Sequence, residues 1–453
     1  MAQLSSIFPS RKNELYKILV KIAGHTKNHR VIPVLLSGFR QISNEIAQEN
    51  RKLLNPEKAQ YAIFLFRSLI RYPLQEEIYP LLEICEKIGW NTLFPDNINT
   101  AFIHFLKQQE PFWEKKNTLP PDQFYCYRGI AYKYIEKWDR AIEDFSLLLQ
   151  LKPEATEIYN YRGCVKVSQK NLEGALLDFS EALRINPENV ETYWHRGCLK
   201  VEQGDQISAM ADYSEALRLN PYFTRVYLSR GYLKSQMNDL NGAIEDLSQA
   251  IRLNPQLVPA YINRGNYREE RGDPEGALQD FNEAIRLSPK SSNAYANRGL
   301  IRDRMRDLLG ALEDYNQAIH LDPQDLYSYN SRADLKGRMN DWEGAIVDYS
   351  EAIRLSPKDS YTYCSRAHAK EAIHLFESAL EDYSSAIQID PHNTYAYMQR
   401  GTSFHKQKKE EEAKSDFKKF LKLTRDRKTE EIIQSEKNKI FALFPELKRE
   451  ENE

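Results

Sequence analysis

This 453-residue chain contains little cysteine and almost no net charge. Its five cysteines, Cys85, Cys126, Cys164, Cys198 and Cys364, are odd in number and form no C-x-x-C pair. That usage argues against a disulfide framework and against a structural zinc site. The formal net charge of −2 lacks the basic surplus that nucleic-acid-binding proteins use, so we expect no nucleic-acid partner.

Long apolar runs are also missing. No stretch approaches the roughly 20 apolar residues that a membrane-spanning helix needs, and the first residues, MAQLSSIFPSRKNELYK, lack an apolar core followed by a small-residue cleavage site. Hydrophobic residues make up 41% of the chain and charged residues 28%, which is typical of a folded protein. We therefore expect a cytoplasmic protein without a membrane span.

The short motifs of the common enzyme classes are absent as well. The sequence holds no G-x-x-x-x-G-K-[ST], G-x-G-x-x-G, H-E-x-x-H or G-x-S-x-G. His368, Glu371 and His374 are three residues apart, a spacing that does not keep all three on one narrow helix face for a metal ion. We expect no enzyme, no cofactor and no metal site.

What the chain has in abundance is internal repetition. Successive prolines stand 34 residues apart at positions 153, 187, 221, 255, 289, 323, 357 and 391. Nine arginines keep the same interval, and each defines one repeat, numbered one to nine: Arg128, Arg162, Arg196, Arg230, Arg264, Arg298, Arg332, Arg366 and Arg400. In every repeat a tyrosine stands three residues before the arginine, an alanine thirteen after it and an aspartate sixteen after it. Such regularity predicts a repeat architecture.

Each repeat is predicted to form two helices joined by a tight turn. Gly204, Asn238, Gly272 and Asn340 occupy equivalent positions in the middle of their repeats, and these residue types tolerate a left-handed backbone at a helix end. The proline closes the second helix, because it has no amide hydrogen and clashes inside a helix. A glycine follows the arginine in most repeats, and we expect it to face the alanine of the second helix.

Five features make residues 122–423 resemble tetratricopeptide repeats. They are the 34-residue period, the glycine, the alanine, the aromatic residue that follows the aspartate and the closing proline. The resemblance implies an all-α fold, a right-handed α-solenoid (superhelix) of stacked helix-turn-helix repeats that follows an N-terminal helical region. It also implies that the first helices line a concave groove for a protein or peptide.

Two features depart from the family pattern. Arginine stands where the family more often has leucine, and in seven repeats a lysine or arginine replaces the usual tyrosine four residues later. Because every repeat also carries the aspartate, we predict that arginine, aspartate and this second base bridge the two helices of each repeat.

The binding surface is predicted from variation among the repeats. The variable stripe comprises the first-helix positions two residues before and two, five and six residues after each arginine, which helical spacing places on one side. It is apolar and aromatic in repeats one to four and polar with mixed charge later. The candidate contact residues are Asn160, Trp194, Val201, Leu228, Tyr232, Asn266, Arg304, Asp334 and Arg338. An alternative is that part of this stripe packs against the next repeat.

We expect a non-catalytic interaction scaffold or assembly factor that binds a peptide or an amphipathic helix in the groove. The position two before the arginine is never basic, so a clamp for the C-terminal carboxylate of a chaperone is not expected. One alternative is a regulatory or sensor subunit that controls a partner enzyme through residues 1–121, and a second is an enzyme in its own right.

Three regions follow from this interpretation. Residues 1–121 lack the repeat but have helical patterns, and they form either a cap for the first repeat or a docking region. Residues 122–423 hold the nine repeats. Residues 424–453 combine Ile440, Phe441 and Phe444 with many charges, which predicts a capping helix over the last repeat and a charged tail.

Overall fold

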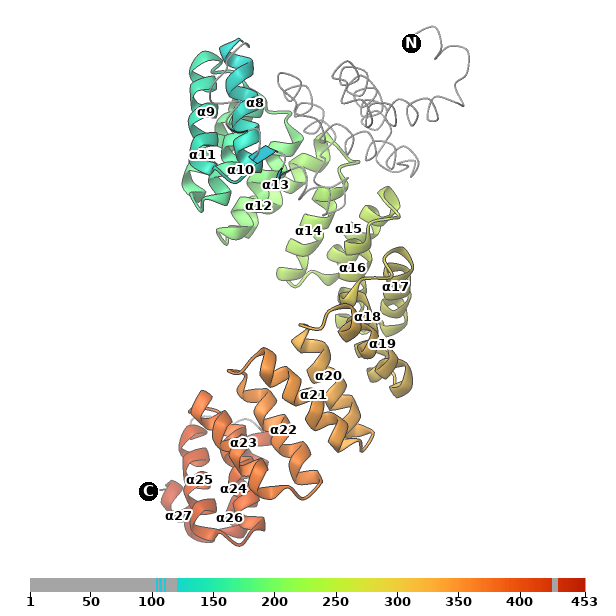
Figure 1. Cartoon of the computed structure of the whole chain (residues 1–453), viewed down its shortest axis with the longest axis vertical. Coiled ribbons are helices and arrows are strands. Elements are labelled where there is room, and N and C mark those ends of the chain that lie inside the picture. Colours follow the sequence, from blue (N-terminus) through green and yellow to red (C-terminus); the bar gives the residue numbers. More distant parts are fainter. Residues whose placement is uncertain (1–102, 105, 108–109, 111–119, 426–430, 453) are drawn as a thin grey trace, which may run out of the picture. The chain divides into compact units, whose positions relative to one another are not determined.

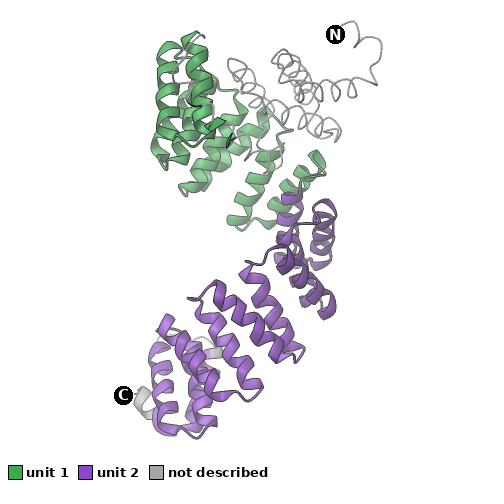
Figure 2. Cartoon of the chain, in the orientation of Figure 1, with its two compact units in different colours: residues 1–257 green, residues 258–453 purple. Residues whose placement is uncertain are grey.

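The computed structural model describes residues 103–104, 106–107, 110, 120–425 and 431–452. Most of the predicted N-terminal region, residues 1–121, lies outside these residues. The chain divides into two compact units, residues 1–257 and residues 258–453 (Figure 2). All elements of the described part are helices, and none of them is both long and apolar enough to cross a bilayer.

In the described part of unit 1, eight helices from α8 to α15 follow one another, and Figure 1 labels them in chain order. They are α8 (Pro121–Tyr134), α9 (Trp138–Leu151), α10 (Thr156–Ser168), α11 (Leu172–Ile185), α12 (Val190–Glu202), α13 (Gln206–Leu219), α14 (Thr224–Gln236) and α15 (Leu240–Leu253).

Unit 2 continues the same alternation and adds two terminal helices. They are α16 (Val258–Glu270), α17 (Pro274–Leu287), α18 (Ser292–Arg304), α19 (Leu308–Leu321), α20 (Leu326–Arg338), α21 (Trp342–Leu355), α22 (Ser360–Ala372), α23 (Phe376–Ile389), α24 (Thr394–Lys406), α25 (Glu410–Leu423), α26 (Glu431–Leu443) and α27 (Pro445–Asn452).

From α8 to α25, consecutive helices pack as pairs, one pair for each repeat of the sequence. Within a unit, the second helix of a pair also packs against the first helix of the next pair, as α9 does against α10 and α21 against α22. First helices of neighbouring pairs also touch, for example α10 with α12 and α18 with α20. This stacking lets each repeat bury an apolar face that it could not cover alone.

The turn inside each repeat follows the predicted backbone. Gly204, Asn238, Gly272 and Asn340 all have positive φ, between 62° and 85°. In the other five repeats the equivalent residue also has positive φ, although none is glycine or asparagine: Glu136, Lys170, Arg306, His374 and Lys408. In six repeats an aspartate or asparagine follows this residue and caps the second helix, as Asp205 does by accepting the amide N–H of Ser208.

The core of each pair is built from the repeated alanine and the residue four positions after it, which is Leu247 in repeat four and aromatic in the other eight. Both are almost fully buried, as Ala175 and Phe179 show. In most repeats the atoms nearest to the glycine belong to the aromatic ring and not to the expected alanine. A Cβ built on Gly163 would lie 2.6 Å from Cε1 of Phe179. The aromatic ring, one turn beyond the alanine, extends across the first helix and occupies the space that the missing side chain leaves.

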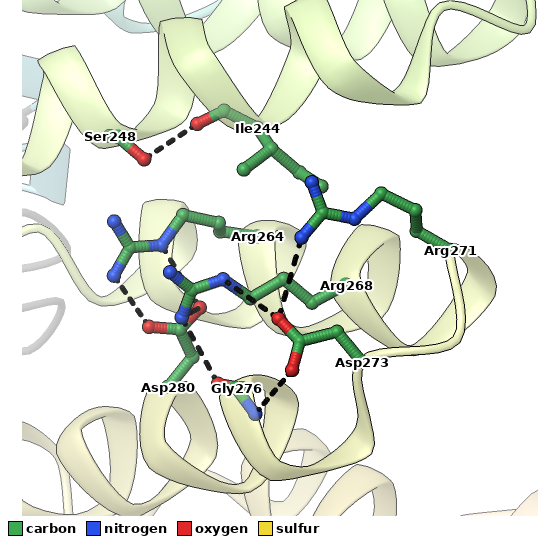
Figure 3. Close-up of polar contacts among 8 residues, drawn as sticks. All are labelled: Ile244, Ser248, Arg264, Arg268, Arg271, Asp273, Gly276 and Asp280. Atoms are coloured by element: carbon green, nitrogen blue, oxygen red, sulfur yellow. Dashed lines mark hydrogen bonds and ion pairs between the residues drawn. The ribbon is translucent and has the colours of Figure 1, made fainter.

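The predicted arginine–aspartate network is present in all nine pairs. In repeat five, Nε and Nη2 of Arg264 donate to the two oxygens of Asp280 at 2.9 and 2.6 Å, and Nη1 of the second base, Arg268, reaches Oδ2 at 2.9 Å (Figure 3). The aspartates are nearly fully buried. The arginine also links neighbouring repeats, since Arg298 donates to Asn282 of the preceding pair at 2.8 Å. These residues therefore hold the two helices of a repeat, and neighbouring repeats, together.

At the C-terminal end, α26 and α27 cover the last pair. Phe417, Phe420 and Leu421 of α25 form one buried cluster with Ile440, Phe444 and Leu447. The rings of Phe417 and Phe444 lie 5.7 Å apart. The apolar residues predicted to cap the last repeat thus do contact it.

Candidate functional site

Exposure along the variable stripe is graded. Two residues before the arginine the side chains are largely buried, as Ala296, Cys364 and Met398 show. Six residues after it they are mostly exposed, as at Gln236 and Glu270. The accessible part of the variable stripe therefore lies near the C-terminal end of each first helix.

Trp194 contacts the neighbouring repeat. Its Nε1 donates to Oγ of Ser229 at 3.0 Å, its ring lies edge-on to Phe223 at 6.1 Å, and the guanidinium of Arg225 stands 5.6 Å from its centroid. These contacts give the tryptophan a structural role between α12 and α14. Val201 packs in the same cluster.

Four other candidates in repeats two to five differ in accessibility. Asn160 is buried, and its Oδ1 has no hydrogen-bond partner among the described residues. Leu228 and Asn266 are half-buried. Tyr232, in contrast, is 49% exposed, which makes it the most accessible aromatic candidate that the variable stripe supplied.

In unit 2 the charged candidates pair across neighbouring repeats. Arg304 forms an ion pair with Glu269, and Arg338 forms one with Asp303. In both cases the acid stands five residues after the repeated arginine of one repeat. The base stands six residues after the repeated arginine of the next repeat. Each of these pairs joins a half-buried acid to an exposed base, and such pairs add little stability. The bases therefore remain accessible to a ligand.

Asp334 lies deeper than the other charged candidates. It accepts a hydrogen bond from the hydroxyl of Tyr349, and burial raises the pKa of its carboxyl. The carboxylate thus contributes to the packing of α20 on α21.

The structure adds three tyrosines that the sequence interpretation missed. Tyr327, Tyr361 and Tyr395 stand five residues before the arginines of repeats seven, eight and nine, and their exposed fractions are 44%, 57% and 49%. This position is one helical turn before the first residue of the variable stripe, so the three extend the same helix face. The aromatic residues at this one register were the signal that could have identified them.

The described residues give no indication of a metal site. They contain no group of three histidine, cysteine, aspartate or glutamate side chains that could hold a metal ion. Burial raises the pKa of the Cys364 thiol to about 12, which disfavours the reactive thiolate. The exposed candidate side chains of the first helices, which could contact a partner, are aromatic or charged.

Comparison with family models gives matches over several segments. One model described as a tetratricopeptide repeat matches residues 128–190, 228–292 and 262–325, and a second with the same description matches residues 190–223 and 394–427. Together these segments cover half of the chain. No curated protein matches the sequence.

Solved structures with similar chains are distant in sequence. A tetratricopeptide repeat protein from Parabacteroides merdae is 19% identical, with a TM-score of 0.44 over 55% of this chain and 98% of its own. The hetero-tetramer Cut9–Hcn1 of the APC/C gives 13% identity and a TM-score of 0.43 over 87% and 95% of the two chains. YrrB, described as having an unusual peptide-binding site, gives 21% and 0.37 over 42% and 98%.

Proposed function

Because this chain belongs to the tetratricopeptide repeat family, we propose that it is a non-catalytic scaffold that holds a segment of another protein along its first helices. The bound segment is an extended peptide or an amphipathic helix. The observation that carries the proposal is a difference among the first-helix residues. The repeated charged side chains pair with one another, whereas some of the variable side chains, such as Tyr232, Arg304 and Arg338, are exposed.

The repeated charged residues are engaged mainly with one another. Each arginine places two N–H groups on its aspartate, as Arg332 does on Asp348 at 2.8 and 2.6 Å, and the second base, Lys336, supplies a further contact at 2.8 Å. A partner must therefore be recognised by residues that differ between repeats.

Accessible aromatic residues supply the main contacts. Tyr232, Tyr327, Tyr361 and Tyr395 present large rings that lose little conformational entropy on binding. Arg304 of α18 and Arg338 of α20 add charged positions on first helices. Trp194 stabilises the packing of α14, which carries Tyr232, against α12, because its Nε1 donates to Ser229 of α14.

Exposed apolar residues on the second helices serve as a matched control for the first-helix tyrosines. Ile207, Leu309 and Val347 are more than 60% exposed and lie on second helices. A partner that docks there would not meet the variable stripe at all.

Affinity capture from the native cell lysate distinguishes these surfaces. The bait is the full chain, compared with a Tyr232→Ala/Tyr361→Ala/Tyr395→Ala variant and with an Ile207→Ala/Leu309→Ala/Val347→Ala control. We expect a partner that the wild type and the control retain and the tyrosine variant loses, with equal circular dichroism for all three. Loss of the partner from the control alone would move the interface to the second helices.

A further inference from the structure

Three exposed tyrosines form a row on consecutive repeats of unit 2, and we call it the tyrosine row. Tyr327, Tyr361 and Tyr395 are each the second residue of a first helix, in α20, α22 and α24. Their exposed fractions lie between 44% and 57%. In repeats one to six the equivalent position holds no aromatic residue. The tyrosine row therefore presents one accessible ring per repeat over three repeats.

The spacing of the rings follows from the stacking of the repeats. α20 packs against α22, and both α22 and α24 pack against α23. Side chains at one register of successive first helices repeat at the distance between those helices. Because the axes of packed helices are about 8–10 Å apart, a ligand that crosses the first helices meets a ring at about that interval.

This interval matches one backbone conformation of a bound segment. A polyproline II helix has three residues per turn, so every third side chain points the same way, about 9 Å from the last. A β-strand returns to one face after about 7 Å and falls out of step with the rings. An α-helix repeats after about 10 Å over seven residues, but its apolar face is wider than a single row and needs a correspondingly wide apolar groove.

The flank of the tyrosine row is polar. One helical turn after each tyrosine, on the same side of the first helix, stands a half-buried residue without charge: Ser331, Ser365 and Gln399. This flank gives an amphipathic helix no second apolar strip. The row therefore fits a ligand that makes one apolar contact per repeat.

The carboxylates next to the tyrosine row are engaged within their own helices. Asp325 accepts the backbone N–H of Tyr327 at 3.1 Å and the hydroxyl of Ser328. Asp359 makes the same two contacts in repeat eight, and in repeat nine the capping residue is an uncharged asparagine, Asn393. Because these caps use their oxygens internally, the row favours an uncharged segment.

We propose that the tyrosine row binds a polyproline II segment of the partner with proline at every third position. Each proline packs on the face of one tyrosine ring, and the tyrosine hydroxyls donate to carbonyl groups that a polyproline II helix leaves without internal partners. About seven residues of such a segment span the three rings. This inference rests on the proposed function, because it names the conformation and the sequence pattern of part of the bound segment.

Three uncharged synthetic peptides test the inference with the full-length chain. The first has proline at every third position among glutamine and serine, and the second has the same composition with irregularly spaced prolines. The third is an amphipathic helix of leucine, alanine and glutamine. Binding is measured by fluorescence anisotropy to the wild type, to Tyr361→Ala and to Tyr222→Ala, with circular dichroism as the check on folding. Tyr222 is the matched control, because it is 64% exposed but lies between α13 and α14, outside the tyrosine row.

The wild type and Tyr222→Ala are expected to bind the regularly spaced proline peptide about tenfold more tightly than the irregular one. Tyr361→Ala removes the middle ring and should lose most of this preference, while salt should hardly change the affinity, because no charge is involved. Equal binding of the two proline peptides, an equal loss in both variants or tighter binding of the helical peptide would overturn the inference, as would a wild type that binds none of them. The proposed function is tested separately by the affinity capture, which requires no proline in the partner.

Discussion

Removing one buried aspartate should open its repeat, whereas replacing the whole charged network should not. Asp314 is 2% exposed. It accepts hydrogen bonds from Arg298 at 2.9 and 2.6 Å and from Arg302 at 3.0 Å. Asp314→Ala therefore strands two partly buried cations between α18 and α19.

The expected cost follows from that burial. Breaking a buried ion pair costs about 3–5 kcal/mol, and because the guanidiniums keep some contact with water we expect the lower end, about 3 kcal/mol. This corresponds to on the order of a 100-fold increase in the population of the open state. Replacement of all three residues by apolar ones, Arg298→Leu/Arg302→Tyr/Asp314→Leu, leaves no unpaired charge and should stay within about 1 kcal/mol of the wild type.

Hydrogen exchange read by mass spectrometry is the suitable assay, because repeat arrays open locally and do not unfold in a single step. The control is Glu283→Ala. Glu283 accepts two hydrogen bonds from Arg286 with the same geometry, at 2.8 and 2.6 Å, but on the exposed surface. Exchange in α18 and α19 that changes less than about threefold in Asp314→Ala would refute the reasoning, as would a triple variant that is opened as much as the single one.

Other predictions concern pH and the backbone. Burial, helped by two nearby positive charges, lowers the pKa of His195 to about 4. The unfolded chain then binds a proton that the folded one does not, so stability is constant above about pH 6.5 and falls by about 3 kcal/mol towards pH 4. Urea titrations should show that His195→Phe lacks this part of the loss. Gly163→Ala, whose Cβ would meet the ring of Phe179, should cost about 1–3 kcal/mol and lower the Tm. Arg306→Gly, at φ 68°, should instead raise stability by about 1 kcal/mol, and an unchanged or lower Tm would count against backbone strain at that turn.

Much of the architecture could be predicted from the sequence because the constraint recurs in every repeat. A fixed spacing separates the arginine, the second base and the aspartate in most repeats. At that spacing the opposite charges can form an ion pair between the two paired helices. Glycine or asparagine marks the turn in four repeats. In other repeats, such as those of Lys170 and His374, the turn residue has the same left-handed backbone, but its residue type does not predict this conformation. The surrounding helices impose it.

The binding surface was harder to predict, because accessibility depends on neighbouring repeats. Trp194 belongs to a variable position, yet Ser229 and Phe223 of the next repeat cover much of it. Tyr361 and Tyr395 were missed because the variable stripe was begun one turn too late.

Site-specific photo-crosslinking tests the central claim most directly. A photoreactive phenylalanine is placed at position 232 or 361 on the first helices, and at position 207 or 309 on the second helices, and crosslinking is carried out in the native cell. The account predicts one crosslinked polypeptide from positions 232 and 361 and none from 207 and 309. The same polypeptide crosslinked only from 207 or 309 would contradict the claim that the first helices form the binding surface.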